Sequence, residues 1–295
     1  MINVLLTGGL GNQLFQYAFG RALAERNRTA LVLHTAYLES KLPFKKWATP
    51  MRYELGVFHI NAQVKQNIFS AAWLYPFAKA EYLLRDSIHA ARYTVLQETD
   101  HAFHADYLQA GDNVYVKGNF QSEKYFADIA PLLRQELVFA SPLTGQNAVL
   151  QQQIRQSAAV ALHIRRGDYI SLAQNAGKFA QVPLSYYQEA MQYIAARISH
   201  PEFYVFSDDI PWAKAHLPTG YQLHFVSHNQ TPETSYIDMQ LMAACQHQII
   251  ANSTFSWWGA WLNAHPQKMV LAPKLWFADN RINSADILPS EWIKL

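Results

Sequence analysis

Short apolar runs alternate with segments of helical periodicity through the C-terminal half of the chain. The apolar runs are typical of buried strands, and the longer periodic segments are typical of helices. Strands are expected at 158–164, 203–206, 222–226, 248–251 and 269–272, with helices between them at 185–198, 212–217, 232–245 and 254–264. This alternation predicts a parallel, doubly wound sheet.

The N-terminal half begins with the same alternation and then becomes less regular. The predicted order is a strand at 3–6, a glycine-rich loop at 7–13, a helix at about 12–26, a strand at 30–34, a long helix at about 62–92, strands near 93–97 and 114–117, and a helix at about 122–137. The segment Ser141-Pro-Leu-Thr-Gly145 carries both Pro and Gly, so it is the best linker. We therefore expect two domains, 1–144 and 145–295.

Two Rossmann-like α/β domains that face a central cleft form the GT-B-like architecture, in which a ligand is held at the strand ends. A chain of 295 residues is long enough to give each domain its own core. The net charge of +2 is too small to indicate a nucleic-acid partner. The single cysteine, Cys245, excludes an intrachain disulfide and is expected in the core, since it lies in an apolar helical stretch.

The sequence also bears on membrane association. It contains no uninterrupted apolar run of about 18 residues, so no transmembrane segment is expected. Its first residues read as a short strand, without the charged and then long apolar regions of a secretory signal. We therefore expect a cytoplasmic protein whose association with the inner membrane, if any, is peripheral.

Polar side chains follow the predicted strand at 248–251. In Asn252-Ser-Thr-Phe-Ser256, amide and hydroxyl groups stand where a helix begins, and a Trp-rich apolar face follows. The N–H groups and the dipole at such a helix start favour a bound phosphate. The alternative is that these residues only cap a core helix.

A second polar group follows the strand at 158–164. His163, Arg165, Arg166 and Asp168 lie at its carboxyl end, where open α/β sheets bind ligands. Adjacent strand residues point to opposite faces, so only one of the two arginines is expected to face a ligand. A guanidinium suits the oxygens of a pyrophosphate. The alternative is a surface ion pair between one arginine and Asp168.

The glycine-rich loop invites comparison with dinucleotide-binding loops. Gly9 and Gly11 are present, but Leu14 occupies the third glycine position, and the second strand ends in His34-Thr35 without an acidic residue. No Gly-Lys-Ser or Gly-Lys-Thr of a P-loop is present either. We expect no nicotinamide or flavin cofactor. The loop is either a tight turn capped by Asn12 or a place where backbone and the Asn12 and Gln13 amides approach a ligand.

Three motifs together carry a family resemblance: Gly8-Gly-Leu-Gly-Asn-Gln-Leu-Phe-Gln-Tyr17, His163-Ile-Arg-Arg-Gly-Asp-Tyr169 and Asn252-Ser-Thr-Phe-Ser-Trp-Trp-Gly259. With them in this order, the chain resembles bacterial α-1,2-fucosyltransferases of glycosyltransferase family 11 over nearly its whole length. The resemblance implies inverting transfer of L-fucose from GDP-β-L-fucose to the 2-hydroxyl of a terminal galactose in a glycan. It also implies that residues 1–144 serve the acceptor, that residues 145–295 bind the donor, and that no metal or other cofactor is needed.

The resemblance also implies roles for single residues. His163 and Asp238 resemble guanine contacts, and Arg165 resembles the arginine on the diphosphate and the leaving oxygen. The rest of the donor site would comprise Arg166, Asn252, Ser253, Thr254 and Ser256, and the acceptor-side loop would comprise Gly9, Gly11, Asn12 and Gln13.

Two questions about mechanism stay open at the sequence level. Asp168 is the nearest motif carboxylate for taking the acceptor proton. Alternatively, a donor phosphate oxygen takes it while Asn12 positions the hydroxyl. Asp208 and Asp209 are adjacent and lack the spacing of a metal-binding Asp-x-Asp, so Arg165 and a helix start would stabilise the leaving diphosphate.

Other classes of function compete with the transferase. The aromatic surplus would also suit a non-catalytic carbohydrate-binding protein, although such a protein has no need of a diphosphate site. A fucosyltransferase of another linkage is a further alternative. Acceptor specificity is expected to depend on residues 41–93, which are rich in aromatic side chains.

Overall fold

The computed structural model describes residues 1–39, 51–66, 75–166, 180–279 and 281–295. These residues form two compact units, Met1–Ala140 with Ile282–Pro289, and Ser141–Arg281 with Ser290–Leu295. The division thus falls after Ala140 rather than after residue 144. Residues 282–289, which the sequence assigns to the second domain, belong to the first unit.

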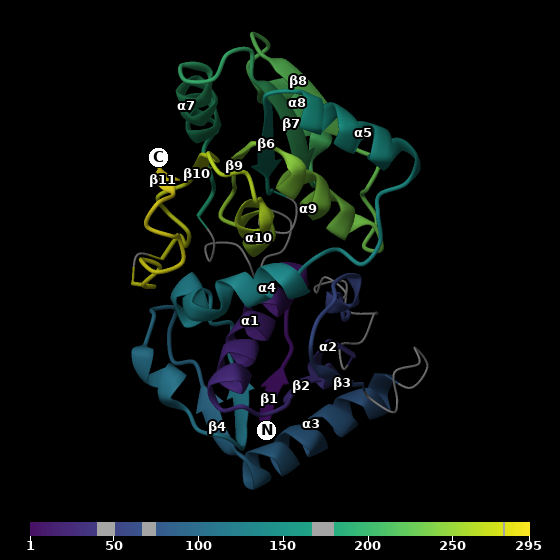
Figure 1. Cartoon of the computed structure of the whole chain (residues 1–295), viewed down its shortest axis with the longest axis vertical. Helices are drawn as coiled ribbons and strands as arrows, with labels where there is room; N and C mark the ends of the chain where they lie inside the picture. Colours follow the sequence, from purple (N-terminus) through teal and green to yellow (C-terminus); the bar gives the residue numbers. More distant parts are fainter. Residues whose placement is uncertain (40–50, 67–74, 167–179, 280) are drawn as a thin grey trace. The chain divides into compact units, whose positions relative to one another are not determined.

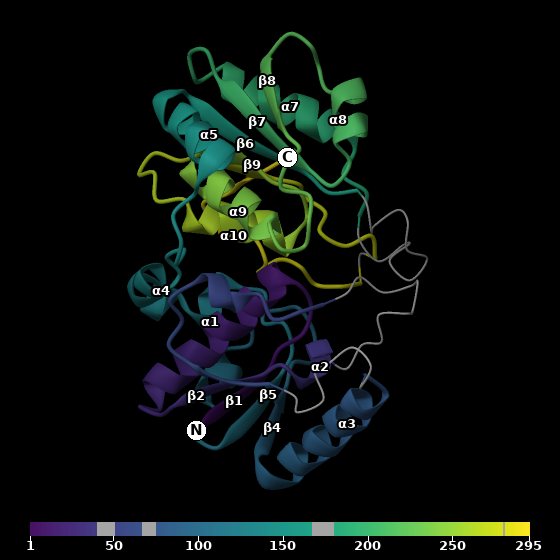
Figure 2. The same cartoon turned by 90° about the vertical axis from the view of Figure 1, so that its right-hand side faces the viewer.

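The first unit is built on a parallel five-stranded sheet. Its strands are β1 (Ile2–Leu5), β2 (Leu31–His34), β3 (Gln63–Lys65), β4 (Thr94–Gln97) and β5 (Val114–Lys117), in the order β3-β2-β1-β5-β4. Helix α1 (Leu10–Arg26) covers one face and α3 (Tyr75–Arg92) covers the other (Figure 2). The described part of this unit also contains the helices α2 (Ala36–Glu39) and α4 (Ala130–Glu136) and the 3-10 turns η1 (Leu55–Val57), η3 (Ala105–Gln109), η4 (Glu123–Tyr125) and η5 (Ala127–Ile129).

The second unit contains a parallel six-stranded sheet in the order β11-β10-β9-β6-β7-β8 (Figure 1). The strands are β6 (Ala159–Ile164), β7 (Glu202–Ser207), β8 (Gln222–Val226), β9 (His247–Ile249), β10 (Val270–Ala272) and β11 (Ile293–Lys294). The helices are α5 (Gly145–Gln156), α7 (Leu184–Ala195), α8 (Ile210–His216), α9 (Ser235–Ala244) and α10 (Thr254–Leu262).

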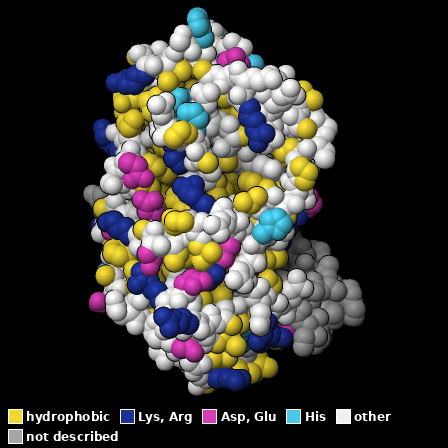
Figure 3. Space-filling view, viewed as in Figure 1, with side chains coloured by type: hydrophobic (Ala, Val, Ile, Leu, Met, Phe, Trp, Pro, Cys, Tyr) yellow, Lys and Arg dark blue, Asp and Glu magenta, His cyan; other side chains and the backbone are white. Residues whose placement is uncertain are grey.

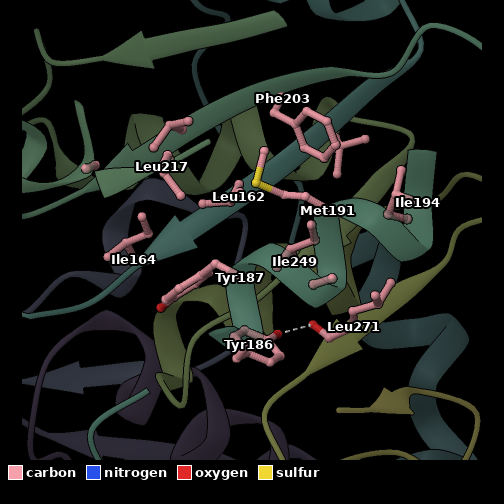
Figure 4. Packing of buried hydrophobic residues seen from close by; sticks show 14 residues of the cluster. Leu162, Ile164, Tyr186, Tyr187, Met191, Ile194, Phe203, Leu217, Ile249 and Leu271 are labelled. Carbon is pink, nitrogen blue, oxygen red and sulfur yellow. Dashed lines mark hydrogen bonds between the residues drawn. The ribbon is translucent and has the colours of Figure 1, made fainter. Parts of the chain in front are cut away.

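Side-chain alternation along β6 divides the core of the second unit into two layers. Val160, Leu162 and Ile164 belong to the cluster that includes residues of α7 and α8. Figure 4 shows Leu162 and Ile164 beside Tyr187 and Met191 of α7. The Tyr186 hydroxyl in this layer donates to the backbone oxygens of Ile250 (2.7 Å) and Leu271 (2.9 Å). The opposite layer contains Ala159 and Ala161, residues of α5 and α9, and the buried Cys245. His163 therefore lies on the α5 and α9 face.

Several sequence-based elements were wrong. The long helix predicted from residue 62 begins only at Tyr75, because Gln63–Lys65 pairs with β2 as an edge strand. The helix predicted at 122–137 is broken into 3-10 turns and α4, which has a proline in its first turn. Gly145 is the first residue of the unpredicted helix α5 rather than the end of the linker. The edge strand β11 has two residues, too few for a periodic signal.

Charged side chains of both signs are distributed over the surface face that Figure 3 draws. On the face drawn in Figure 3, outside the grey atoms, cationic and anionic side chains are interspersed among apolar ones. Neither sign forms a continuous patch on that face. No helix within the described ranges is long and apolar enough to cross a membrane.

Candidate active site

The second unit has a topological switch point between β6 and β9. From β6 the chain continues to β7 and β8 on one side, whereas β9, β10 and β11 lie on the other. The segments that follow β6 and β9 therefore border one crevice at the carboxyl edge, where α/β sheets bind ligands. Arg165 follows β6, and Ser253 and Thr254 follow β9. Two of the three sequence motifs thus meet at the place that topology favours for a ligand.

The two motif arginines have different surroundings. Arg165 Nε lies 3.2 Å from Asp208 Oδ2, and its side chain is about one-third exposed. Arg166 Nε lies 3.4 Å from Asp209 Oδ2, and its guanidinium carbon lies 3.9 Å from the centre of the Trp212 ring. Arg166 is therefore packed onto α8, and Arg165 is the better placed of the two for a ligand. The partners that the structure describes are Asp208 and Asp209, while Asp168 lies outside the described residues.

His163 is a buried, neutral imidazole. Burial lowers its pKa to about 3, and the charge of Arg165 acts in the same direction. Its ring centre lies 5.8 Å from that of Phe255 on α10, so it borders the segment after β9. Among the described residues its Nδ1 has no hydrogen-bond partner. A neutral imidazole can donate one hydrogen bond and accept another, as recognition of a polar ring requires.

Asp238 lies in the first turn of α9 and is 9% exposed. It accepts a hydrogen bond from Asn229 Nδ2 at 2.8 Å, and burial raises the pKa of this carboxyl to about 7. Asn229 in turn exchanges hydrogen bonds of 3.0 Å with Asn147, whose Oδ1 lies 2.8 Å from His228 Nε2. These four residues form the Asp238 cluster. The sequence analysis did not identify Asn147, Asn229 and His228 as site residues. The one feature of the sequence that these three share is their position beside a predicted or observed strand end or helix start.

The residues at the start of α10 divide into two groups. Ser253 precedes the helix without a side-chain capping bond, and Thr254 is half-buried, so both lie at the helix start. The Ser256 hydroxyl is buried and donates to the Ala251 and Ser253 backbone oxygens at 3.3 and 3.2 Å. The Asn252 amide donates to the Ala180 and Trp276 oxygens at 2.8 and 2.9 Å. Asn252 and Ser256 therefore hold backbone in place, which differs from the donor contacts expected of them.

The glycine-rich loop of the first unit is a tight turn followed by α1. Gly8 has φ of +74°, and a Cβ there would lie 2.3 Å from Asn12 Nδ2, so both backbone conformation and space require glycine. Gly9 is exposed ahead of the helix, and Gly11 is buried in its first turn. Asn12 is half-buried, and its Oδ1 accepts a hydrogen bond from Gln121 at 3.1 Å.

Gln13 does not offer its amide to a ligand, contrary to the sequence-based expectation. The side chain is fully buried, and its Nε2 donates to the Gly8 oxygen (2.9 Å) and the Arg52 oxygen (2.7 Å). Its Oε1 accepts from the Glu54 backbone N–H at 2.9 Å. Gln13 thus clamps residues 52–54 onto the loop. Glu54 was missed because the sequence gives no sign that it lies near the loop.

Within the described ranges, no three His, Cys, Asp or Glu side chains converge as a metal site. Metal independence therefore stays a prediction about the reaction, to be tested by removing divalent ions.

Comparisons with known proteins agree with the whole-chain resemblance. The sequence model of glycosyl transferase family 11 matches residues 1–295. The chain is 34% identical to the O-antigen biosynthesis glycosyltransferase WbnK of Escherichia coli, over 98% of this chain and 99% of that protein. It is 29% identical to the alpha-1,2-colitosyltransferase of Escherichia coli, over 98% and 97%.

A solved structure supports the fold. A mutant of Arabidopsis thaliana FUT1 in complex with GDP gives a TM-score of 0.50 at 10% identity, over 99% of this chain and 75% of that one. At this identity the likeness shows the fold alone. Together with the two parallel α/β sheets, it confirms the predicted GT-B class.

Proposed function

The chain belongs to glycosyl transferase family 11, and on that basis we propose that it is an α-1,2-fucosyltransferase. The proposed reaction moves L-fucose from GDP-β-L-fucose to the 2-hydroxyl of a terminal galactose, with inversion and without a metal ion. Nearly full-length similarity to an O-antigen glycosyltransferase and an α-1,2-colitosyltransferase supports this proposal. An O-antigen glycan is accordingly the class of acceptor that we propose.

The observation that carries the proposal is the pairing of two motifs at the switch point of the second sheet. Arg165 after β6 and the start of α10 after β9 supply a guanidinium and a helix N-terminus at one crevice. Both favour a diphosphate, since a helix start binds anions and a guanidinium hydrogen-bonds two phosphate oxygens. A non-catalytic sugar-binding protein would have no use for this combination.

The two groups also suit the chemical step. As the bond between the sugar and the diphosphate breaks, negative charge grows on the leaving phosphate oxygen. Fixed donors that face this oxygen stabilise the transition state more than the ground state. We propose that Arg165 is such a donor to the leaving phosphate oxygen. A bound diphosphate would then compete with Asp208 for the Arg165 guanidinium.

We propose that His163 and the Asp238 cluster recognise the base of the donor. Guanine presents a ring N–H and an amino group side by side, and an ionised carboxylate accepts both. Asn229 holds one oxygen of Asp238 at 2.8 Å and so fixes the plane of the carboxylate. His163 reaches the same face of the sheet as α9, with an unpaired Nδ1 among the described residues.

A second candidate donor follows from the similarity to the colitosyltransferase. Colitose is fucose without its 3-hydroxyl, so GDP-colitose would fit the same diphosphate and base contacts. A site that hydrogen-bonds the 3-hydroxyl rejects the deoxy sugar strongly, because its own polar groups are then left unpaired.

The test is a donor panel with a fixed set of acceptors. GDP-fucose, GDP-colitose and GDP-mannose would each be incubated with lactose, N-acetyllactosamine and lacto-N-biose, and products detected by mass spectrometry. We expect transfer from GDP-fucose to at least one galactoside. Transfer from GDP-colitose alone would replace fucose in the proposal, and binding of galactosides without transfer from any donor would contradict it.

A further inference from the structure

The first unit has a switch point of its own, at the glycine-rich loop. In the order β3-β2-β1-β5-β4, the loops after β1 and β5 border one crevice. Gln16 joins the two loops, because its Nε2 donates to Thr7 Oγ1 (2.7 Å) and to the Gly118 oxygen (3.0 Å). Asn12 and Gln121 form a second link between them. The glycine-rich loop is thus a fixed platform at the ligand-binding edge of this sheet.

A carboxylate is held against this platform. The three hydrogen bonds of Gln13 fix residues 52–54 beside the loop, and the Leu10 backbone N–H hydrogen-bonds the Glu54 carboxylate. Glu54 Oε2 would lie 3.7 Å from a Cβ built on Gly9, whose backbone is exposed. The Glu54 side chain is 16% exposed, so it is mostly buried without being sealed from solvent.

The Glu54 charge is weakly compensated. Arg52 Nε lies 3.9 Å from Oε1, at the outer limit of an ion pair, and the arginine side chain is 40% exposed. Burial raises the pKa of Glu54, while Arg52 and the Leu10 N–H only partly oppose this change. Among the described residues, the cation paired with Glu54 is Arg52, at this long distance. A partly desolvated carboxylate whose described ion pair is this long has the surroundings of a general base rather than of a structural ion pair.

Two other carboxylates of the first unit show the contrast. Glu98 accepts the Asn119 and Phe120 backbone N–H groups on its two oxygens, at 2.6 and 2.9 Å. Glu136 accepts from Arg21 Nε at 3.0 Å and from the Tyr17 hydroxyl at 2.5 Å. Each of these two carboxylates accepts hydrogen bonds from two donors of the fold. The hydrogen bond described for the Glu54 carboxylate comes from the Leu10 backbone N–H.

We propose that Glu54 is the catalytic base of the transfer, acting on an acceptor hydroxyl bound at the glycine-rich loop beside Asn12. This inference rests on the proposed function. The acceptor oxygen forms the new bond to the anomeric carbon, and the bond from that carbon to the diphosphate oxygen breaks with its electron pair left on the nucleotide. The hydroxyl proton goes to Glu54, which returns it to solvent after the product leaves. The role replaces that predicted for Asp168.

The test compares Glu54→Gln with wild type, using GDP-fucose or GDP-colitose, whichever the wild type uses, and its best acceptor from lactose, N-acetyllactosamine and lacto-N-biose. We expect kcat to fall by about a hundredfold or more, with the GDP Kd unchanged. The fall of kcat/KM on the acidic side of its pH profile should disappear, because glutamine has no carboxyl group to protonate. Glu25→Gln, on the exposed side of α1, is the matched control and should behave as wild type.

Stability separates this role from helix capping. The folded-state pKa of Glu54 is raised, so ionisation costs stability as the pH rises, and glutamine removes that cost while keeping an oxygen for Leu10. A catalytic Glu54 predicts an equal or higher Tm for the inactive variant. The proposal would be overturned if Glu54→Gln had a lower Tm and a kcat within about threefold of wild type. It would also be overturned if the acidic side of the kcat/KM pH profile were unchanged in this variant. If the wild-type protein transfers sugar from neither GDP-fucose nor GDP-colitose, the proposed function itself is wrong, and this result is obtained before any variant is measured.

Discussion

Asp238→Asn is predicted to weaken nucleotide binding and to strengthen folding. The Asp238 carboxyl is 9% exposed, and burial raises its pKa from 3.8 to about 7. A change of about 3 pKa units corresponds to roughly 4 kcal/mol of free energy for ionising the group in the free folded protein. A carboxylate retained at such a cost is typical of a residue that serves binding rather than stability.

The sign of the stability effect follows from the two pKa values. Between pH 3.8 and about 7 the unfolded chain has released the proton while the folded protein still holds it. The contribution of Asp238 to stability therefore falls as pH rises through this window and stays low above it. Asparagine keeps an oxygen for Asn229 but carries no charge. The variant should exceed wild type in unfolding free energy by about 1–4 kcal/mol at pH 8 and match it near pH 4.

GDP binding should change in the opposite direction. The asparagine presents one N–H where guanine requires an acceptor, and a lost hydrogen bond to a buried donor costs about 2 kcal/mol. The GDP Kd at pH 8, measured by calorimetry, should therefore rise about thirtyfold. Wild-type affinity should also fall as pH drops below about 7, a dependence that the variant lacks.

The control for the GDP measurement is Asp128→Asn, an exposed carboxylate paired with Arg26 at 2.7 Å in the first unit. It should leave the GDP affinity unchanged. An unchanged GDP Kd in Asp238→Asn, together with the predicted gain in stability, would exclude Asp238 from nucleotide binding. Asp238 would then be a buried acid of the fold with no part in base recognition.

Three further outcomes follow from the site. Arg165→Lys should lower kcat/KM about a hundredfold or more in steady-state assays, because lysine lacks the planar guanidinium fork. Arg166→Lys should mainly lower stability, because it loses the contact with Trp212. A large loss of activity in Arg166→Lys with a mild effect of Arg165→Lys would contradict the choice of Arg165 as the diphosphate ligand. Activity should persist in excess EDTA, whereas a loss of more than about tenfold that manganese or magnesium restores would show a metal requirement. Asn252→Ala should lower the free energy of unfolding, measured with denaturant, by about 2 kcal/mol or more, because the Ala180 and Trp276 oxygens lose their donor. A wild-type unfolding midpoint would contradict this structural role of Asn252.

The fold was predictable where burial produced a clear sequence pattern. The central strands of the second sheet are buried on both faces, so 158–164 and 203–206 were visible as apolar runs. The first unit was harder because β3 is a polar edge strand of three residues. Its conformation depends on pairing with β2, which no local periodicity reports.

The candidate site divides in the same way. The positions of His163, Arg165 and Ser253 at the carboxyl edge of the second sheet were predictable, because His163 lies near the end of β6, Arg165 directly follows β6, and Ser253 lies between β9 and α10. Their contacts with a donor stay a prediction. The positions of Glu54 beside the glycine-rich loop and of Asn229 beside Asp238 were not predictable, because each depends on a tertiary hydrogen bond, to Gln13 in the first unit and to Asp238 in the second. Asn252 and Gln13 illustrate the opposite error, since motif amides that look suited to a ligand are used to hold backbone.

The chemical structure of the product tests the proposed α-1,2-fucosyl transfer directly. The protein would be incubated with GDP-β-L-fucose and its best galactoside, and the new linkage determined by NMR from the anomeric coupling and the inter-residue correlations. We expect fucose in the α configuration on the 2-hydroxyl of the terminal galactose, since one displacement inverts the β-linked donor. A β product, a linkage to another hydroxyl, or no transfer from GDP-fucose would contradict the proposed reaction.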